Sequence, residues 1–416
     1  MKLKDIAEYV TDKISSDAID LDCYVTTDSL LQNKAGREVA VNLPPQVCTL
    51  THFRQSDILI GNIRPYLKKI WMADIDGGCN ADVLVIRAKD GHSPSFIYAL
   101  LLQDAFYEYA MKGAKGSKMP RGDKDQIMRY EIPTLASTEE SIGKFIVDIR
   151  DKIALLTQIN RNLEAMARQL YDYWFVQFDF PDENGKPYKS SGGAMVWNEK
   201  LKRDIPKGWK ECTLHRYIGR ITNGLNPRQN FVLGTGSNFY VSIRSLEGRD
   251  INWESCEKCD DSALAKINSR SQLQCGDVIF SAIGTIGRTY YIQEDPNNWN
   301  ISETSFAIRP SKEIPSSFFY ELLISPEIQM QADKNAMGST MRCLVMDALC
   351  KIPTMDIPTN VVNKFNNIIA PIHNALYERN KEKRNLYKLR EELLPLLMNG
   401  QVSVMPPEIN CDLSHD

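Results

Sequence analysis

The chain has 416 residues, of which 43% are hydrophobic, so it is too long for one ordinary core and long enough for two domains with additional helices. Its formal net charge of −3 excludes a strongly basic protein, and a case for nucleic-acid binding must therefore rest on local charge. The ten cysteines follow no disulfide or zinc-site spacing, and no apolar run approaches the roughly 18 residues of a membrane span. We expect a soluble cytoplasmic protein without a metal site.

The first domain is expected over residues 1–138. A short amphipathic helix opens it, and strand-forming runs follow at residues 58–60, 69–72 and 83–87. This mixture predicts an α+β domain.

A long helix is predicted next, over residues 139–178. Ile142, Ile149 and Leu156 lie seven residues apart, and Asn160 falls in the second position of the same heptad seam. The following residues 179–207 are rich in Pro, Gly, Ser and charge, which is typical of a linker.

The second domain is expected over residues 208–358, with strand-forming runs at 277–281, 289–292 and 305–309. A second long helix is predicted over residues 359–400, with a tail at 401–416. Its apolar seam is less regular and is interrupted at Arg379 and Lys383.

Several patterns in the two halves recur at one separation of 220 residues, which indicates a tandem duplication. Asp57 matches Asp277 at the start of a strand-forming run, and Asn160 matches Asn380 within the long helices. A seam asparagine usually sets register, so we expect Asn160 and Asn380 to meet each other or a shared polar contact. The alternative is two exposed asparagines.

Known catalytic motifs are not found. The sequence contains no phosphate-binding loop, no dinucleotide fingerprint, no zinc-protease motif and no nucleophile elbow, and its five histidines are scattered. An enzyme such as a nuclease with an unrecognised site remains an alternative, although Asp57 and Asp277 resemble strand-start residues more than catalytic carboxylates.

Local positive charge is strongest in residues 110–130, which hold six Lys and Arg against two Asp. Glycines there allow close approach to a phosphate, lysines neutralise it, and an arginine reaches a guanine edge. The candidate DNA contacts in this loop are Lys115, Ser117, Lys118 and Arg121; its less charged counterpart contains Ser339, Thr340 and Arg342. The alternative is a solvated surface loop.

Two further segments are candidates for DNA contact. Turns after matching strands carry Arg64, Tyr66 and Lys68 in the first copy and Thr285 and Arg288 in the second. A third segment contributes Asn226 and Arg228, residue types that read base edges and serve equally well in an ordinary turn.

The chain resembles the specificity subunits of type I restriction-modification systems over residues 1–404. The resemblance rests on the duplication and on border sequences at residues 170–178 (LYDYWFVQF), 205–209 (IPKGW) and 389–402 (LREELLPLLMNGQV). It implies two target-recognition domains, each reading one half of a bipartite double-stranded DNA site, and two long helices that pair as an antiparallel coiled coil.

The resemblance also implies partners and a non-catalytic role. Two methyltransferase subunits would bind S-adenosylmethionine, restriction/translocase subunits would bind ATP and magnesium, and this chain would bind no cofactor. The two domains share little sequence, which suggests unlike half-sites, and the weakened second seam leaves Arg379 and Lys383 free to face a partner subunit.

Two other functions stay open from the sequence. One is a coiled-coil scaffold whose α+β domains bind proteins, which fits the acidic net charge. The other is a solitary specificity subunit that serves methylation without an active restriction partner.

Overall fold

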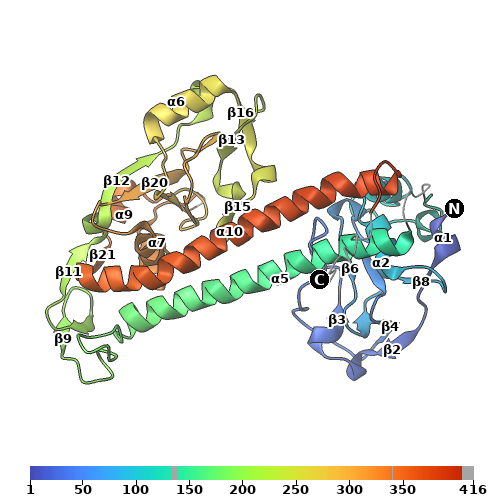
Figure 1. Cartoon of the computed structure of the whole chain (residues 1–416), viewed down its shortest axis with the longest axis horizontal. Helices are drawn as coiled ribbons and strands as arrows, with labels where there is room; N and C mark the ends of the chain where they lie inside the picture. Colours follow the sequence, from blue (N-terminus) through green and yellow to red (C-terminus); the bar gives the residue numbers. More distant parts are fainter. Residues whose placement is uncertain (133–137, 340, 405–416) are drawn as a thin grey trace, which may run out of the picture. The chain divides into compact units, whose positions relative to one another are not determined.

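The computed structural model describes residues 1–132, 138–339 and 341–404, and two compact units can be distinguished (Figure 1). Unit 1 combines Met1–Leu155 with the chain from Lys383 onward, and unit 2 is Leu156–Glu382. The two long helices, α5 (Glu139–Tyr171) and α10 (Thr359–Met398), each contribute residues to both units. The domains expected from sequence treat the long helices as separate segments, whereas the two compact units divide each helix between them. The expected boundaries therefore stay predictions.

Unit 1 is a mixed α+β structure with two four-stranded sheets. The first has the order β1-β8-β5-β6 and the second the order β2-β4-β7-β3. Their strands are β1 (Ala7–Tyr9), β2 (Lys13–Ser15), β3 (Tyr24–Val25), β4 (Thr49–Phe53), β5 (Ile58–Gly61), β6 (Ile70–Met72), β7 (Gly77–Cys79) and β8 (Val83–Ala88). The short helices are α1 (Leu3–Ile6), α2 (Pro94–Leu101), α3 (Asp104–Lys112) and α4 (Lys124–Ile127).

The core of unit 1 forms where α2 covers the first sheet. Ser93 caps α2 by accepting a hydrogen bond from the Phe96 N–H, and Pro94 occupies the first helical turn. The helix is apolar almost throughout and buries six consecutive residues from Phe96 onward, as expected for a helix enclosed on all sides. Ile142 and Ile146 of α5 and Leu394 and Leu397 of α10 belong to the same core.

Unit 2 repeats this plan with additional strands. Its main sheet has the order β12-β20-β17-β18, which matches β1-β8-β5-β6 strand for strand. These strands are β12 (Ile218–Asn223), β17 (Val278–Ser281), β18 (Thr289–Tyr291) and β20 (Ser305–Pro310). The other strands are β9 (Met195–Asn198), β10 (Arg203–Pro206), β11 (Lys210–Thr213), β13 (Asn238–Val241), β14 (Leu246–Glu247), β15 (Asp250–Ile251), β16 (Glu257–Cys259), β19 (Trp299–Ile301) and β21 (Pro353–Asp356).

Helices α6 (Asp261–Ser271), α7 (Ser316–Ile324), α8 (Pro326–Asn335) and α9 (Met346–Cys350) complete unit 2. Its largest core joins α7, the main sheet and both long helices, with Phe175 and Phe318 in ring contact with Phe365. The aromatic border sequence therefore acts in packing, at the π-helical turn Asp172–Val176 that ends α5.

The segment expected to be a linker, residues 179–207, contains a β-hairpin in which β9 pairs antiparallel with β10. Phe180 stacks between the rings of Tyr188 and Trp209, so aromatic contacts fix this segment to unit 2. Its Pro, Gly and Ser residues thus form turns within a folded element.

The two matched aspartates lie directly before the central strands β5 and β17. Asp57 pairs with Arg87 on β8, and Asp277 pairs with Arg309 on β20, each through two hydrogen bonds of 2.7–2.9 Å. Both carboxylates are buried and fully engaged in this pairing. They are strand-start residues, as the sequence favoured, rather than free catalytic carboxylates.

The seam asparagines also meet as predicted. The Asn160 amide donates a 2.8 Å hydrogen bond to Oδ1 of Asn380, and both residues are buried within unit 2. The alternative of two exposed asparagines is therefore wrong.

Candidate nucleic-acid interface

Two of the candidate segments in unit 1 lie against each other. Residues 115 and 121 exchange two main-chain hydrogen bonds of 2.9 Å and so close the glycine-rich loop into a hairpin. The N–H of Arg64 then donates to the carbonyl of Pro120 at 2.7 Å, which joins this loop to the turn after β5. The structure therefore forms one continuous surface from segments 64–68 and 115–121.

Unit 2 has the same arrangement about 220 residues later along the chain. Met337 and Cys343 exchange main-chain hydrogen bonds of 2.8 and 2.9 Å, and the Gly284 N–H donates to the carbonyl of Arg342 at 2.8 Å. Gly284 thus occupies the place of Arg64, and the loop 337–343 occupies the place of the loop 115–121. The contact between the hairpin loop and the turn therefore occurs in both copies of the repeat.

Charged groups of the unit 1 loop are only partly neutralised. Lys115 pairs with Asp123 at 3.0 Å and Arg121 pairs with Asp82 at 2.9 Å, yet the cationic side chains are 83% and 60% exposed. Ser117 and Lys118 are exposed at the tip of the hairpin. The loop therefore presents cations that a polyanion can reach, with neighbouring carboxylates that limit their net charge.

Tyr66 and Lys68 lie on the turn formed by the 3-10 helix η3 (Pro65–Leu67). Tyr66 is 49% exposed, whereas the Lys68 ammonium lies 2.9 Å from Asp104 of α3. Lys68 therefore contributes to holding the turn in place as well as to its charge.

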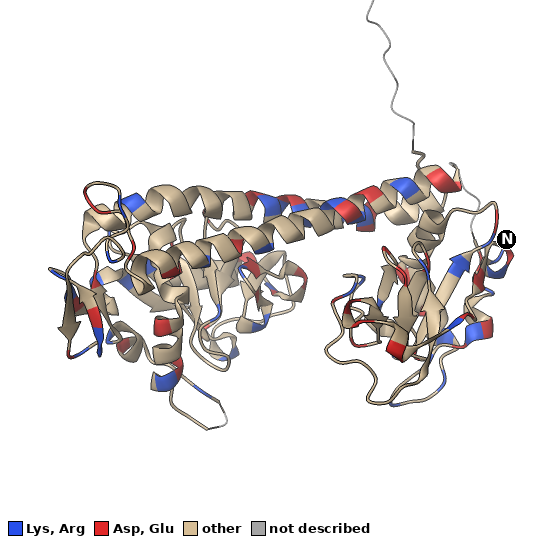
Figure 2. Cartoon of the chain, turned by 90° about the horizontal axis from the view of Figure 1, so that it is seen from below, with Lys and Arg blue, Asp and Glu red and all other residues tan. Residues whose placement is uncertain are grey.

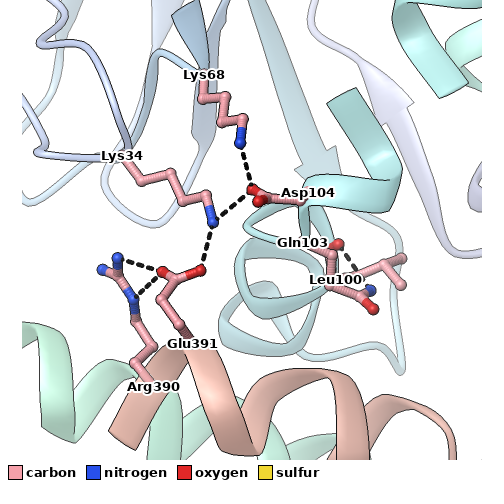
Figure 3. Close-up of polar contacts among 7 residues, drawn as sticks. All are labelled: Lys34, Lys68, Leu100, Gln103, Asp104, Arg390 and Glu391. Atoms are coloured by element: carbon pink, nitrogen blue, oxygen red, sulfur yellow. Dashed lines mark hydrogen bonds and ion pairs between the residues drawn. The ribbon is translucent and has the colours of Figure 1, made fainter. Parts of the chain in front are cut away.

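A network of ion pairs continues from this turn to the long helix α10 (Figure 3). The buried Lys34 ammonium lies 2.8 Å from Asp104 and 2.9 Å from Glu391, and Arg390 lies 2.7 Å from Glu391. The backbones also pair, because the Lys34 N–H donates to the Lys68 carbonyl at 2.8 Å. The exposed turn is thus fixed to both α3 and α10.

The network controls the ionisation of its two carboxyl groups. Burial alone would raise the pKa of Asp104, but hydrogen bonds from Lys34 and Lys68 outweigh burial and its pKa is lowered. Burial likewise opposes ionisation of Glu391, and Lys34 together with Arg390 lowers its pKa. Both groups are therefore carboxylates at neutral pH.

Candidate residues in unit 2 are more engaged with the protein itself. The Arg288 guanidinium donates to the carbonyls of Ile243 and Leu246 at 3.1 and 3.0 Å. Arg342 is paired with Asp333, and Thr285 accepts a hydrogen bond from the Ser281 hydroxyl through its carbonyl. Ser339 is exposed on the loop, and Thr340 lies outside the described residues.

The third candidate segment forms a capped turn. Asn226 accepts a hydrogen bond from the Arg228 N–H at 2.9 Å and donates to Glu303 at 2.9 Å, so its amide serves local structure. Arg228 itself is exposed.

No family model matches the chain. It is 21% identical over 359 residues to the type I restriction enzyme MjaIX specificity subunit of Methanocaldococcus jannaschii, which covers 86% of this chain and 80% of that protein. It is 22% identical over 463 residues to the type I restriction enzyme HindI specificity subunit of Haemophilus influenzae, covering 96% and 98%. The chain is thus similar over most of its length to two proteins named as type I restriction enzyme specificity subunits.

The fold of a specificity subunit agrees with this relationship. The crystal structure of the type I restriction-modification S subunit from M. genitalium superposes with a TM-score of 0.59 at 15% identity, and 95% of each chain is covered. The mixed α+β fold of this chain is therefore shared with a solved structure.

Sequence reasoning missed two exposed methionines at the candidate interface. Met119 and Met341 are 52% and 69% exposed at corresponding places in the two hairpin loops. Their repeat relationship was the signal that could have found them, because exposed apolar side chains at matched loop tips suggest contact with a ligand.

Within residues 1–132, 138–339 and 341–404, no group of three or more His, Cys, Asp or Glu is placed to hold a metal ion. No helix in those ranges is long and apolar enough to span a bilayer.

Proposed function

We propose that this chain is the sequence-reading subunit of a type I restriction-modification complex and that each α+β domain reads one half of a bipartite DNA target. The proposal rests on the contact between the hairpin loop and the turn that follows the central strand. This contact occurs in both copies of the repeat, and in unit 1 the loop presents exposed cations. Homology to named specificity subunits supports the same function.

The long helices would set the distance between the half-sites. The N-terminal part of α5 shares a core with the C-terminal part of α10 in unit 1. In unit 2 the Asn160–Asn380 pair joins the middle parts of the two helices, and Tyr171 and Phe365 near their other ends share a core. These contacts favour an antiparallel coiled coil. A 33-residue helix spans roughly 50 Å, which is longer than the roughly 34 Å of one DNA turn, so paired helices can act as a spacer.

Catalysis would belong to partner subunits. Two methyltransferase subunits would bind S-adenosylmethionine and dock on the helices, and restriction/translocase subunits would bind ATP and magnesium.

A protein-binding scaffold is the second candidate, because acidic and basic residues are interspersed over both units and along the long helices (Figure 2). Electrostatic binding to DNA weakens steeply with salt, and it is accompanied by a preferred sequence only if bases are read. These two properties separate a DNA reader from a scaffold.

The test is selection from a randomised double-stranded DNA library by the purified complex of this chain with the methyltransferase of its own genome. The proposal predicts enrichment of one split motif with a constant spacer, and affinity that falls as salt is raised from about 50 to 200 mM. A complex that is stable yet enriches no motif would contradict the proposal and favour a scaffold.

A further inference from the structure

A hollow of about 240 Å³ opens on the surface of unit 1 beside the hairpin loop. Its walls come from three separate segments: residues 26–28, residues 63–69, and residues 80–82, with Met119 at the rim. Arg64, Asn80, Asp28 and Asp82 are among the residues that line it. Residues that donate hydrogen bonds and residues that accept them therefore lie together around this hollow at the candidate interface.

Arg64, which lines this hollow, has a strained backbone. Its φ is 53°, in the left-handed region that disfavours side chains. The corresponding residue in unit 2 is Gly284, with φ of 84°, and both residues donate the same hydrogen bond to the hairpin loop. The fold therefore needs no side chain at this place, and an outlier that packing does not require points to function.

The Arg64 guanidinium also contains an unsatisfied donor. Its Nε is buried and makes no hydrogen bond, and among the residues that the structure describes none forms an ion pair with the guanidinium. In contrast, Arg121 is paired with Asp82 and the Lys69 ammonium donates to the carbonyl of Thr27. A buried donor left unsatisfied is costly, so its presence beside the hollow calls for a functional explanation.

A matching acceptor lies in the same wall. Oδ1 of Asn80 is buried and has no hydrogen-bond partner, and Asp28 adds an exposed carboxylate. The hollow therefore offers a guanidinium fork beside amide and carboxylate oxygens. Carboxylates repel a phosphate but accept hydrogen bonds from an exocyclic amine, so this lining suits a base edge better than the DNA backbone.

From these observations we infer that Arg64 is a specificity-determining residue of the first domain and reads a guanine of its half-site through O6 and N7. Arginine is the side chain whose fork fits these two acceptors, and the amine of the paired cytosine would face Asn80 or Asp28. The inference rests on the proposed function. Because Gly284 lacks a side chain, the second domain has no residue at this place that could read a base. The two half-sites are therefore expected to differ at this position.

The test repeats the DNA selection with Arg64→Gly. Gly284 shows that glycine suits this backbone, so the variant is expected to fold with unchanged or raised thermal stability. The expected result is loss of guanine preference at one position of one half-site, by at least about tenfold, with the other half-site and the spacer unchanged. Ser56→Gly, at another residue with positive φ outside the hollow, is the matched control and should leave the motif intact.

A second variant separates base reading from phosphate contact. Arg64→Lys keeps the charge without the planar fork, so guanine preference should fall while sequence-independent affinity is kept. Weaker binding of both variants to all sequences, with an unchanged motif, would assign Arg64 to a phosphate contact and overturn the inference. Variants that bind and select DNA as the wild type does would also overturn it. If the wild-type complex itself selects no motif, the proposed function fails before Arg64 is tested.

Discussion

At the scale of single residues, the buried aspartates show how a duplicated sequence keeps the same local chemistry. Asp57 also accepts a hydrogen bond from the Arg54 N–H, and Asp277 accepts one from Gln274, so each carboxylate ties a turn to its strand. Their arginine partners lie two positions apart in repeat numbering, at 87 and 309. The duplication in the sequence identified the two aspartates. Their arginine partners do not match at the same separation, so only the structure identified them.

Asp57→Asn and Asp277→Asn should each destabilise the protein by about 2 kcal/mol, because a neutral amide leaves a largely buried guanidinium without its bidentate partner. Urea unfolding of the two variants would measure this loss, with Asp90→Asn as an exposed control. Losses below about 0.5 kcal/mol would show that the pairs contribute no more than surface ion pairs.

At the scale of elements, the long helices were predictable because heptad spacing is a local property of the sequence. The Asn160–Asn380 contact followed from the duplication together with that spacing. It is also incompletely satisfied, since Oδ1 of Asn160 is buried without a partner. The pair therefore specifies register at some cost in stability.

Asn160→Leu alone should destabilise unit 2 by about 1–3 kcal/mol, because Asn380 then loses its buried donor. The double variant Asn160→Leu, Asn380→Leu should recover this loss or exceed the wild-type stability, since both polar groups are removed together. Thermal unfolding of the two variants decides the matter. A double variant less stable than the single one would contradict the assigned seam contact.

The ion-pair network at Lys34 makes the stability of unit 1 depend on pH. The folded pKa values of Asp104 and Glu391 lie below their ordinary values of 3.8 and 4.5. Their contribution is therefore fully present above those ordinary values and is lost as pH falls through the lowered ones. The effect is modest, because the two carboxylates are 51% and 43% exposed.

Lys34→Met should lower the free energy of unfolding by about 1 kcal/mol at pH 7, because it removes the buried cation shared by both carboxylates. The difference from wild type should shrink below about pH 4, where the carboxylates become protonated. Unfolding measured from pH 3 to 7, with the exposed Lys112→Met as control, checks this. A difference that stays constant over that range would exclude the network as its cause.

At the scale of the whole molecule, the sequence predicted the α+β class, the tandem repeat, the long helices and the positions of the candidate loops. It could not predict that segments 64–68 and 115–121 meet, because that contact joins residues far apart in the chain through main-chain hydrogen bonds. Asn80, Asp82 and the left-handed backbone of Arg64 were missed for the same reason. The sequence pattern also could not predict that the side chains of Arg288 and Asn226 form hydrogen bonds within the protein.

The central claim, that this chain reads a split DNA target, is tested most directly by mapping methylated adenines across the genome of a host that co-expresses it with its methyltransferase. We predict one bipartite motif with a fixed spacer of about one helical turn, present only when this chain is expressed. A continuous motif, or no new methylation despite a stable complex, would contradict the account.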